Sequence, residues 1–302
     1  MNAPVLATVE QATLATVQDL GRAEATVIGV PRAGAWHRQR YGLATALVAP
    51  DPEPTTPTIE LLAGTIVLRA RAVTAAAVVG PAAVILRGTD APTDTTLALA
   101  VDDVLTVRHE GPGPVYVALA GWREPLVLGS ASTDTFSRLG GRLLAAGDEL
   151  CGHGDMTEVG SFARVSWARP VRLRVIPSPG MSAARVEWDT GEWDVTTTAR
   201  SGTRLGGAPA GGDGMGPSRP MVVGAIQVTP AGEGIILGPD GGLTGGYAVI
   251  GAVISADLDD VSLLAPGDRI ALAHVDVDEA ARVYDEAERA LRRSIVRPHV
   301  IG

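Results

Sequence analysis

The chain has 302 residues and no lysine, so all 25 of its basic residues are arginine. Arginine keeps its proton and cannot serve as a Schiff-base amine or accept biotin. A P-loop nucleotide site also requires a lysine that reaches the phosphates. These requirements exclude pyridoxal-dependent, biotin-carrier and P-loop functions for this chain.

Cysteine and long apolar runs are also scarce. Cys151 is the only cysteine, which excludes an internal disulfide and fits a reducing cytosol. The N-terminus lacks the basic and apolar regions of a secretory signal, and the longest apolar stretch, 72–86, is too short to cross a bilayer. The net charge is −9 and the longest basic run is Arg292-Arg293. We therefore expect a cytoplasmic protein with neither nucleic acid nor an anionic membrane as a partner.

Glycine and proline are abundant, with 37 and 21 residues, whereas aromatic residues make up 4% of the chain. Short apolar runs recur between turn residues, as is typical of a β-sandwich or barrel. In the first half these runs are 59–62, 66–68, 73–79, 84–86, 97–101, 104–107 and 115–119. We predict a mainly β protein with a short helix at 36–48 and a C-terminal helix that Asp276 or Asp278 caps and that ends near Ile295.

An internal repeat favours two related halves. Residues 143–150, LLAAGDEL, match residues 263–270, LLAPGDRI, and residues 100–105, AVDDVL, form a weaker third copy. The chain length suits two domains, which we place at 1–168 and 169–302. In the second, 171–175 predicts an alternating strand and the glycine-rich segment 202–216 a loop.

The stretch 224–258 contains Thr244-Gly245-Gly246-Tyr247 between apolar runs. Two glycines let the backbone adopt positive φ and come close to a ligand, with two hydroxyl groups beside them. A hairpin turn with a packed tyrosine is the alternative interpretation.

Five motifs follow one another in the order found in a known family. They are TVQDLGR at 16–22 with GVP at 29–31 and GA at 34–35, GSASTD at 129–134, GGR and GD at 140–142 and 147–148, RSGTRLGG at 200–207, and Gln227 with Gly232 and TGGY at 244–247. The chain resembles the family of the 5-oxoprolinase C subunit, also called allophanate hydrolase subunit 2 or KipA-like, which includes biotin-dependent carboxyltransferases.

This resemblance implies two cyclophilin-like β-barrel domains. It also implies a hetero-oligomer with a KipI-like subunit 1, the type of the 5-oxoprolinase B subunit, with or without a lactam-handling A subunit. The expected activity is hydrolysis of amide or lactam C–N bonds by an ATP-using complex, while the isolated chain is inactive. Two alternatives remain open. One is a KipA-like regulator that antagonises a KipI-like kinase inhibitor; the other is the carboxyltransferase of a urea carboxylase-like enzyme, with biotin on a separate carrier.

On this resemblance the expected substrate-binding residues are Ser132, Thr133, Asp134, Arg204, Gln227, Thr244, Gly245, Gly246 and Tyr247. The chain departs from the family's Asp, Arg and Asn on the first helix, where it has His37, Gly42 and Thr45. Catalytic residues cannot be assigned. The remaining candidate, Cys151-Gly152-His153, offers too few ligands for a closed metal site, so no metal site is expected.

Overall fold

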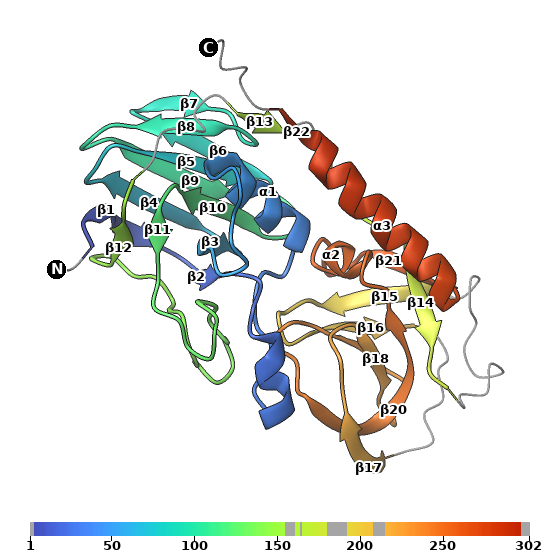
Figure 1. Cartoon of the computed structure of the whole chain (residues 1–302). Coiled ribbons are helices and arrows are strands. Elements are labelled where there is room, and N and C mark those ends of the chain that lie inside the picture. The colour runs from blue at the N-terminus through green and yellow to red at the C-terminus, as the bar shows by residue number, and fades with distance from the viewer. Residues whose placement is uncertain (1–2, 155–160, 164, 180–191, 208–214, 297–302) are drawn as a thin grey trace. The chain divides into compact units, whose positions relative to one another are not determined.

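The computed structural model describes residues 3–154, 161–163, 165–179, 192–207 and 215–296. Strands predominate among them, and a helix lies near the C-terminal end (Figure 1), which confirms the mainly β fold class. The helices are the 3-10 helix η1 (Ala23–Ile28), α1 (Arg38–Val48), α2 (Leu258–Val261) and α3 (Val277–Ser294).

The chain forms two compact units. Unit 1 comprises Met1–Arg22, Ala33–Ser166 and Ala290–Gly302, and unit 2 comprises Ala23–Arg32 and Trp167–Arg289. Two short segments, 23–32 and 290–302, therefore group with the unit that is distant from them in sequence. The domain boundary expected at residue 168 stays a prediction.

Unit 1 contains two antiparallel sheets. The first has the order β11-β12-β1-β4-β9-β6-β7 and the second the order β2-β3-β10-β5-β8. Their strands are β1 (Val5–Ala12), β2 (Ala15–Gln18), β3 (Thr58–Leu61), β4 (Thr65–Ala70), β5 (Thr74–Val79), β6 (Ala82–Leu86), β7 (Thr89–Ala91), β8 (Thr96–Leu99), β9 (Val104–His109), β10 (Val115–Leu119), β11 (Trp122–Arg123) and β12 (Glu149–Gly152). The pair β13 (Phe162–Ala163) and β22 (Ile295–Val296) forms a separate two-stranded sheet, and Phe162 makes an isolated bridge to Thr95 next to β8.

Burial follows from what covers each strand of unit 1. Residues of β4 alternate between buried and half-buried, as expected for a strand with one face in the core. All six residues of β5 are buried, because α1 packs against β5 and β10 on their other side. Trp122, at 1% exposure, is the largest side chain of this core.

Helix α1 begins two residues later in the structure than in the prediction. His37 is its N-cap, and its Nδ1 accepts a hydrogen bond of 3.3 Å from the backbone N–H of Arg40. Trp36 is therefore outside the helix, while Leu43 and Leu47 are buried as the helical spacing predicts.

Unit 2 is an eight-stranded sheet of order β14-β21-β15-β16-β19-β18-β20-β17, and β14 also pairs with β20. That additional pairing closes the sheet around a second core that includes Trp193 and Ile226. The strands are β14 (Arg172–Pro177), β15 (Glu192–Thr197), β16 (Gly202–Gly206), β17 (Met215–Pro220), β18 (Ala225–Val228), β19 (Gly234–Leu237), β20 (Thr244–Val253) and β21 (Arg269–His274).

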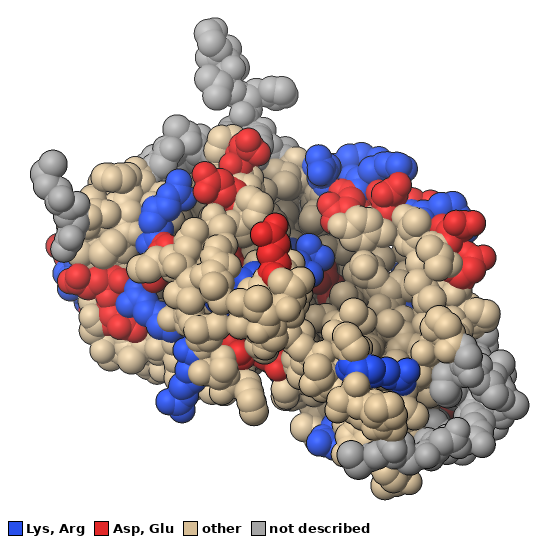
Figure 2. Space-filling view, turned by 60° about the horizontal axis from the view of Figure 1, so that its bottom comes forward, with Lys and Arg blue, Asp and Glu red and all other residues tan. Residues whose placement is uncertain are grey.

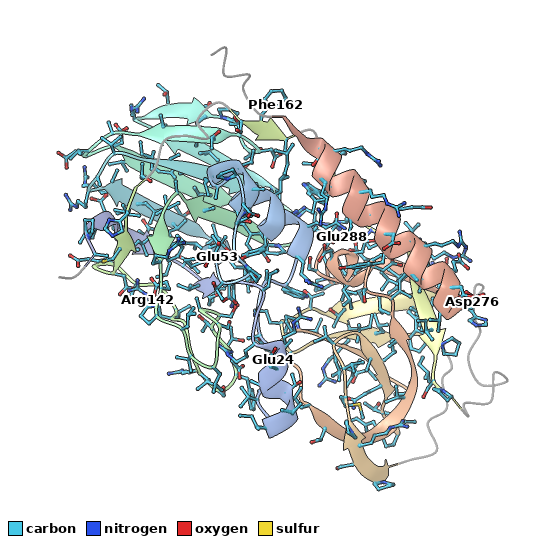
Figure 3. All side chains as sticks on the ribbon, in the orientation of Figure 1. Glu24, Glu53, Arg142, Phe162, Asp276 and Glu288 are labelled. Atoms are coloured by element: carbon cyan, nitrogen blue, oxygen red, sulfur yellow. The ribbon has the colours of Figure 1, made fainter. Side chains whose placement is uncertain are left out.

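The C-terminal helix α3 is confirmed. Asp276 lies at its N-terminal end (Figure 3), where its Oδ1 accepts a hydrogen bond of 2.8 Å from the backbone N–H of Glu279. Arg292 and Arg293 occupy the last turn, where positive charge complements the helix dipole.

The repeated sequence forms the same turn in both units. The backbone N–H of Ala145 donates to Asp148 Oδ2 and that of Ala265 to Asp268 Oδ2, both at 2.8 Å. The glycine of each turn has φ +94°. At the weaker third copy, the N–H of Ala100 donates to Asp103 Oδ2 at 2.7 Å, so the acidic turn occurs three times before a strand.

Two sequence predictions in unit 2 are wrong. Thr244–Tyr247 is not a hairpin turn but the start of β20, since Thr244 pairs with Pro220 and Tyr247 with Met215. The predicted loop at 202–216 starts with strand β16, because Gly202 and its neighbours pair with β19. Residues 208–214 of that loop lie outside the described part of the chain.

Figure 2 shows arginine side chains lying among acidic ones on the face that it presents, with uncharged areas between them. No helix among the described residues is long and apolar enough to span a membrane.

Candidate functional site

In unit 1 two of the sequence motifs meet at the buried carboxylate of Asp19. Its Oδ1 accepts hydrogen bonds from the Gly21 N–H at 2.7 Å, the Ser130 hydroxyl at 2.6 Å and the Ser132 hydroxyl at 2.5 Å. Its Oδ2 accepts the Ala131 N–H at 2.7 Å. Asp19 is fully buried, so its carboxylate joins the segment after β2 to residues 130–132 from inside.

The predicted residues Ser132, Thr133 and Asp134 lie together beside this carboxylate, and each is already engaged. Thr133 Oγ1 donates to the Val17 carbonyl at 3.0 Å. Asp134 Oδ1 accepts from the Phe136 N–H at 3.0 Å, and the Ser137 hydroxyl donates to its Oδ2. Exposure of the three is 5% or less. Their geometry is that of an anchor for the loop; substrate binding by them stays a prediction.

Sequence reasoning missed Asp19 and Ser130 as the centre of this arrangement. The motifs TVQD and GSAS that contain them are evident in the sequence, but nothing in their spacing shows that they meet across more than 100 residues.

In unit 2 two predicted residues share one row of the sheet. Arg204 of β16 and Gln227 of β18 both pair with Ile235 of the intervening β19. The row faces away from the core, because the neighbouring Leu205, Ile226 and Ile236 form the core itself. Arg204 and Gln227 are therefore about 10 Å apart across two strand spacings.

Gln227 lies against the start of β20. A Cβ added to Gly245 would come within 2.3 Å of Gln227 Nε2, so a larger residue here would displace this amide from its position. The Gln227 side chain is 7% exposed, and no hydrogen bond of its amide is found among the described residues. Gly245 and Tyr247 lie on one face of β20, and Thr244 and Gly246 lie on the other. The side-chain amide of Gln227 can both donate and accept hydrogen bonds and is therefore suited to recognising another amide.

Two arginines of the RSGTRL motif have different environments. Arg204 is half exposed and its Nη1 lies 2.5 Å from Glu233 Oε2. Arg200, which the sequence does not single out, is 4% exposed and binds Asp240 through Nε at 2.9 Å and Nη2 at 2.8 Å. Arg200 therefore holds the loop after β19, whereas Arg204 remains accessible from the surface.

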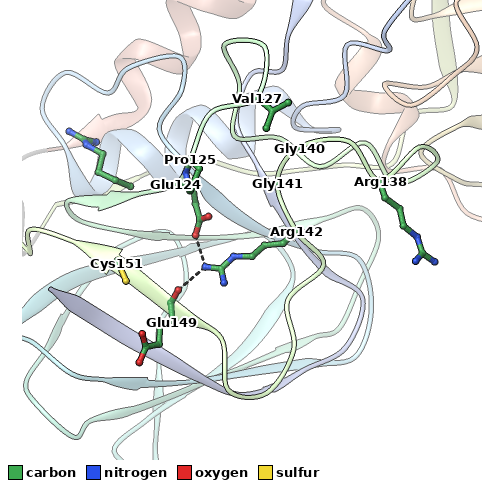
Figure 4. Close-up of a pocket in the computed structure, with 10 residues that line it drawn as sticks. Glu124, Pro125, Val127, Arg138, Gly140, Gly141, Arg142, Glu149 and Cys151 are labelled. Carbon is green, nitrogen blue, oxygen red and sulfur yellow. Dashed lines mark hydrogen bonds and ion pairs between the residues drawn. The ribbon is translucent and has the colours of Figure 1, made fainter. Parts of the chain in front are cut away.

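A cavity of about 620 Å³ opens in unit 1 beneath the loop that joins β11 to β12 (Figure 4). Arg142 is at its centre and donates from Nη2 to Glu124 Oε1 at 2.6 Å and to the Glu149 carbonyl at 2.7 Å. The Cys151 side chain lines the same cavity. No group of three or more His, Cys, Asp or Glu side chains positioned for a metal is found in the described ranges.

Carboxylates also cluster at α2 in unit 2. Burial, together with the charges of Asp257 and Asp259, raises the pKa of Asp260 to about 6. Arg174 donates three hydrogen bonds to the Asp257 carboxylate, from its backbone N–H, Nε and Nη2. Arg174 thus connects β14 to this helix.

The family model described as "carboxyltransferase domain, subdomain A and B" matches residues 28–274. The chain belongs to this family. Two curated relatives are named as the C subunit of 5-oxoprolinase, which confirms the family that the motifs indicate. The Escherichia coli protein is 27% identical over 300 residues, covering 94% of this chain and 96% of that one. The Haemophilus influenzae protein is 32% identical over 185 residues, covering 56% and 58%.

Solved structures of other proteins show the same fold as this carboxyltransferase-family chain. The crystal structure of TTHA0988 has a TM-score of 0.78 and 29% identity, covering 90% of this chain and 55% of that one. The Kluyveromyces lactis urea carboxylase has a TM-score of 0.84 at 22% identity and covers 97% and 29%. This chain thus spans about half of the TTHA0988 chain and less than a third of the urea carboxylase.

The three positions that depart from the family lie on or next to α1. His37 and Thr45 are buried, and the Thr45 hydroxyl donates to the Tyr41 and Gly42 carbonyls at 3.2 and 3.1 Å. Gly42 has space beside it, since an added Cβ would meet its first neighbour, Leu291 Cδ2, at 3.8 Å. His37 and Thr45 thus form hydrogen bonds within the helix, and Gly42 carries no polar group at all.

Proposed function

We propose that this chain is a subunit of an ATP-dependent amide or lactam hydrolase complex of the 5-oxoprolinase type, working with a KipI-like subunit 1. The observation that carries this proposal is the similarity to the 5-oxoprolinase C subunit of Escherichia coli, which extends over 94% of this chain and 96% of that protein. The similarity is therefore between whole chains rather than one shared segment.

The chemistry explains why more than one subunit is needed. Amide resonance makes a lactam carbonyl a poor electrophile, and phosphorylation of the carbonyl oxygen removes that resonance and creates a leaving group. With no lysine for a P-loop, this chain is not a P-loop ATPase. We assign ATP binding to the partner and substrate positioning to this chain.

Within this proposal, Gln227 contacts the amide of the substrate. Its side chain offers one donor and one acceptor group, which matches the N–H and C=O of a lactam. Gly245 and Gly246 allow close approach, Tyr247 shares the face of β20 that carries Gly245, and Arg204 lies in the same row of the sheet as Gln227. The Thr244 hydroxyl, on the other face of β20, is assigned to the same substrate. Ser132, Thr133 and Asp134 contribute indirectly, by fixing the loop in unit 1.

The test is to mix the purified chain with its subunit 1 partner, with and without the lactam-handling A subunit, and to measure ADP release and ring opening together. We expect one ADP per amide bond opened by the mixture and no turnover by the isolated chain. Because His37, Gly42 and Thr45 replace the family residues, the panel includes 5-oxoproline, allophanate and urea derivatives. Turnover by the isolated chain without ATP would refute the proposal.

The role of Gln227 is tested in the same assay. Gln227→Leu should lower kcat/KM by about 10- to 100-fold, since one hydrogen-bonding group is lost from the transition state. Gln11→Leu, on the exposed side of β1, is the matched control and should leave turnover unchanged. Equal activity of the two variants would remove Gln227 from the substrate site.

Carboxyl transfer is a second candidate, favoured by the description of the family model that matches most of the chain. It requires bicarbonate and a biotinylated carrier protein. Turnover that depends on both, rather than on an amide with ATP alone, would move the assignment to carboxyl transfer.

A further inference from the structure

The connection between β11 and β12 in unit 1 spans 25 residues, 124–148, without a strand longer than a single bridge. Four large apolar side chains of this connection face solvent. They form an apolar rim made of Leu126 (52% exposed), Leu128 (51%), Phe136 (84%) and Leu143 (61%). Four exposed apolar side chains of this size on one 25-residue connection point to an interaction surface.

Three of the four rim residues are next in sequence to residues that line the cavity described above. Leu126 and Leu128 flank Val127, and Leu143 follows Arg142, both of which line the cavity. The connection thus carries both exposed apolar side chains and a cavity that can receive a side chain of a partner, as pockets at the centre of protein interfaces do.

The connection is also held rigidly. The Asp19 carboxylate binds residues 130–132 from inside, and Arg22 donates to the carbonyls of Val127 and Ser132. A Cβ on Gly141 would lie 2.3 Å from Thr133 Oγ1, so the backbone here is packed without space. A surface ordered before binding loses little entropy when a partner docks.

Charge at the rim favours an acidic partner. Arg123 and Arg138 line the cavity and are exposed, and neither forms an ion pair within the part of the chain that the structure describes. Arg142 is already paired with Glu124. Two arginines are thus left for carboxylates of a partner.

We propose that the apolar rim and its cavity are the docking surface for the companion subunit of the complex, which contributes an apolar side chain to the cavity and carboxylates to Arg123 and Arg138. This inference rests on the proposed function. A partner protein fits better than a lipid surface because the connection lines a cavity and is fixed by buried hydrogen bonds. The TTHA0988 chain, of which this chain covers 55%, carries a comparable length of additional polypeptide.

The test compares Phe136→Asp and Leu128→Asp with Val73→Asp and Val101→Asp. The control residues belong to the same unit and are similarly exposed, at 55% and 54%, but lie outside the connection. Binding of each full-length variant to the purified KipI-like subunit 1 is measured by calorimetry. We expect the rim variants to raise Kd by about 30-fold or more and the controls by less than about threefold. Arg138→Glu should mainly slow association and weaken its salt dependence.

Hydrogen exchange of the wild-type chain provides a measurement that needs no variant. Amides of residues 125–143 should exchange more slowly in the complex than in the free chain, and those of β9 should not change. Rim variants that bind as tightly as wild type, or exchange that is unaltered at 125–143, would overturn the docking surface even if the complex turns over substrate. If the wild-type mixture shows no ATP-dependent turnover, the proposed function rather than the docking surface is overturned. Concentration-dependent self-association abolished by Phe136→Asp would assign the rim to a second copy of this chain and overturn the proposal.

Discussion

Replacing Asp19 by asparagine tests whether one carboxylate holds the β11–β12 connection. The four hydrogen bonds that Asp19 accepts come from two backbone N–H groups and two serine hydroxyls. An amide has one acceptor oxygen and one donor NH₂ group. In its best orientation the oxygen replaces Oδ1, and the NH₂ group then faces the Ala131 N–H, donor against donor.

The expected cost follows from that geometry. One buried N–H loses its acceptor and a second donor is buried without a partner, and each such loss costs about 1–3 kcal/mol. We expect Asp19→Asn to lower the free energy of unfolding by about 2–4 kcal/mol. For a unit of this size that corresponds to a fall in Tm of roughly 4–16 °C. Asp19→Ala, which removes all four acceptor interactions, should cost more.

The assay is thermal unfolding combined with hydrogen exchange. If the carboxylate positions the connection, amides at 125–143 should exchange faster in Asp19→Asn than in wild type, while those in unit 2 stay the same. Asp102→Asn, at an exposed turn of the same unit, is the control. A Tm within about 1 °C of wild type, with unchanged exchange at 125–143, would refute the reasoning.

Three further predictions concern single positions. Gly121→Ala should lower the free energy of unfolding by more than about 3 kcal/mol, because φ is +73° and the new Cβ would lie 1.6 Å from the His153 carbonyl oxygen. Gly88→Ala, where φ is +79° but the space is open, should lower it by only about 1–2 kcal/mol. Urea unfolding of both variants measures the difference. Arg200→Ala should lower the free energy of unfolding by about 3–5 kcal/mol, because it removes the ion pair of the buried Asp240 carboxylate. Arg204→Ala, which removes an exposed ion pair, should lower it by less than about 1 kcal/mol. Similar losses for the two variants would disprove the assignment of Arg200 as the structural arginine. Because the pKa of Asp260 is raised to about 6, the folded state binds its proton more tightly than the unfolded chain does, and stability from this group falls as pH rises from about 4 to above 6. Asp260→Asn should therefore raise Tm more at pH 7.5 than at pH 4.5, and an equal change at both values would contradict this.

The sequence was most informative where local chemistry determines the structure. Apolar runs bounded by glycine and proline correspond to β3, β4, β5, β6, β8, β9 and β10. Strands β7 and β11, with three and two residues, are too short to give such a signal. Helix α3 was predictable because Asp276 caps an amphipathic pattern with charges suited to both ends.

The candidate site was harder to predict, because it depends on contacts between distant residues. Gly245 was expected to form a turn, but its role is to make room for Gln227 on a neighbouring strand. Likewise, Arg200 and Arg204 are alike in sequence, and only their burial and their partners Asp240 and Glu233 distinguish them. Periodicity shows which face a residue occupies, but not which distant side chain it meets.

The repeated acidic turn allows one copy to guide stabilising substitutions in the other. Residue 146 in the first copy is alanine and residue 266 in the second is proline, yet both turns have the same hydrogen bonds and the same φ at the following glycine. The second copy shows that proline is compatible with this backbone. Ala146→Pro should therefore restrict the unfolded chain without straining the folded one and stabilise unit 1 by about 0.4–1 kcal/mol. A residue that one copy of the turn already contains is thus a substitution that the other copy should accept.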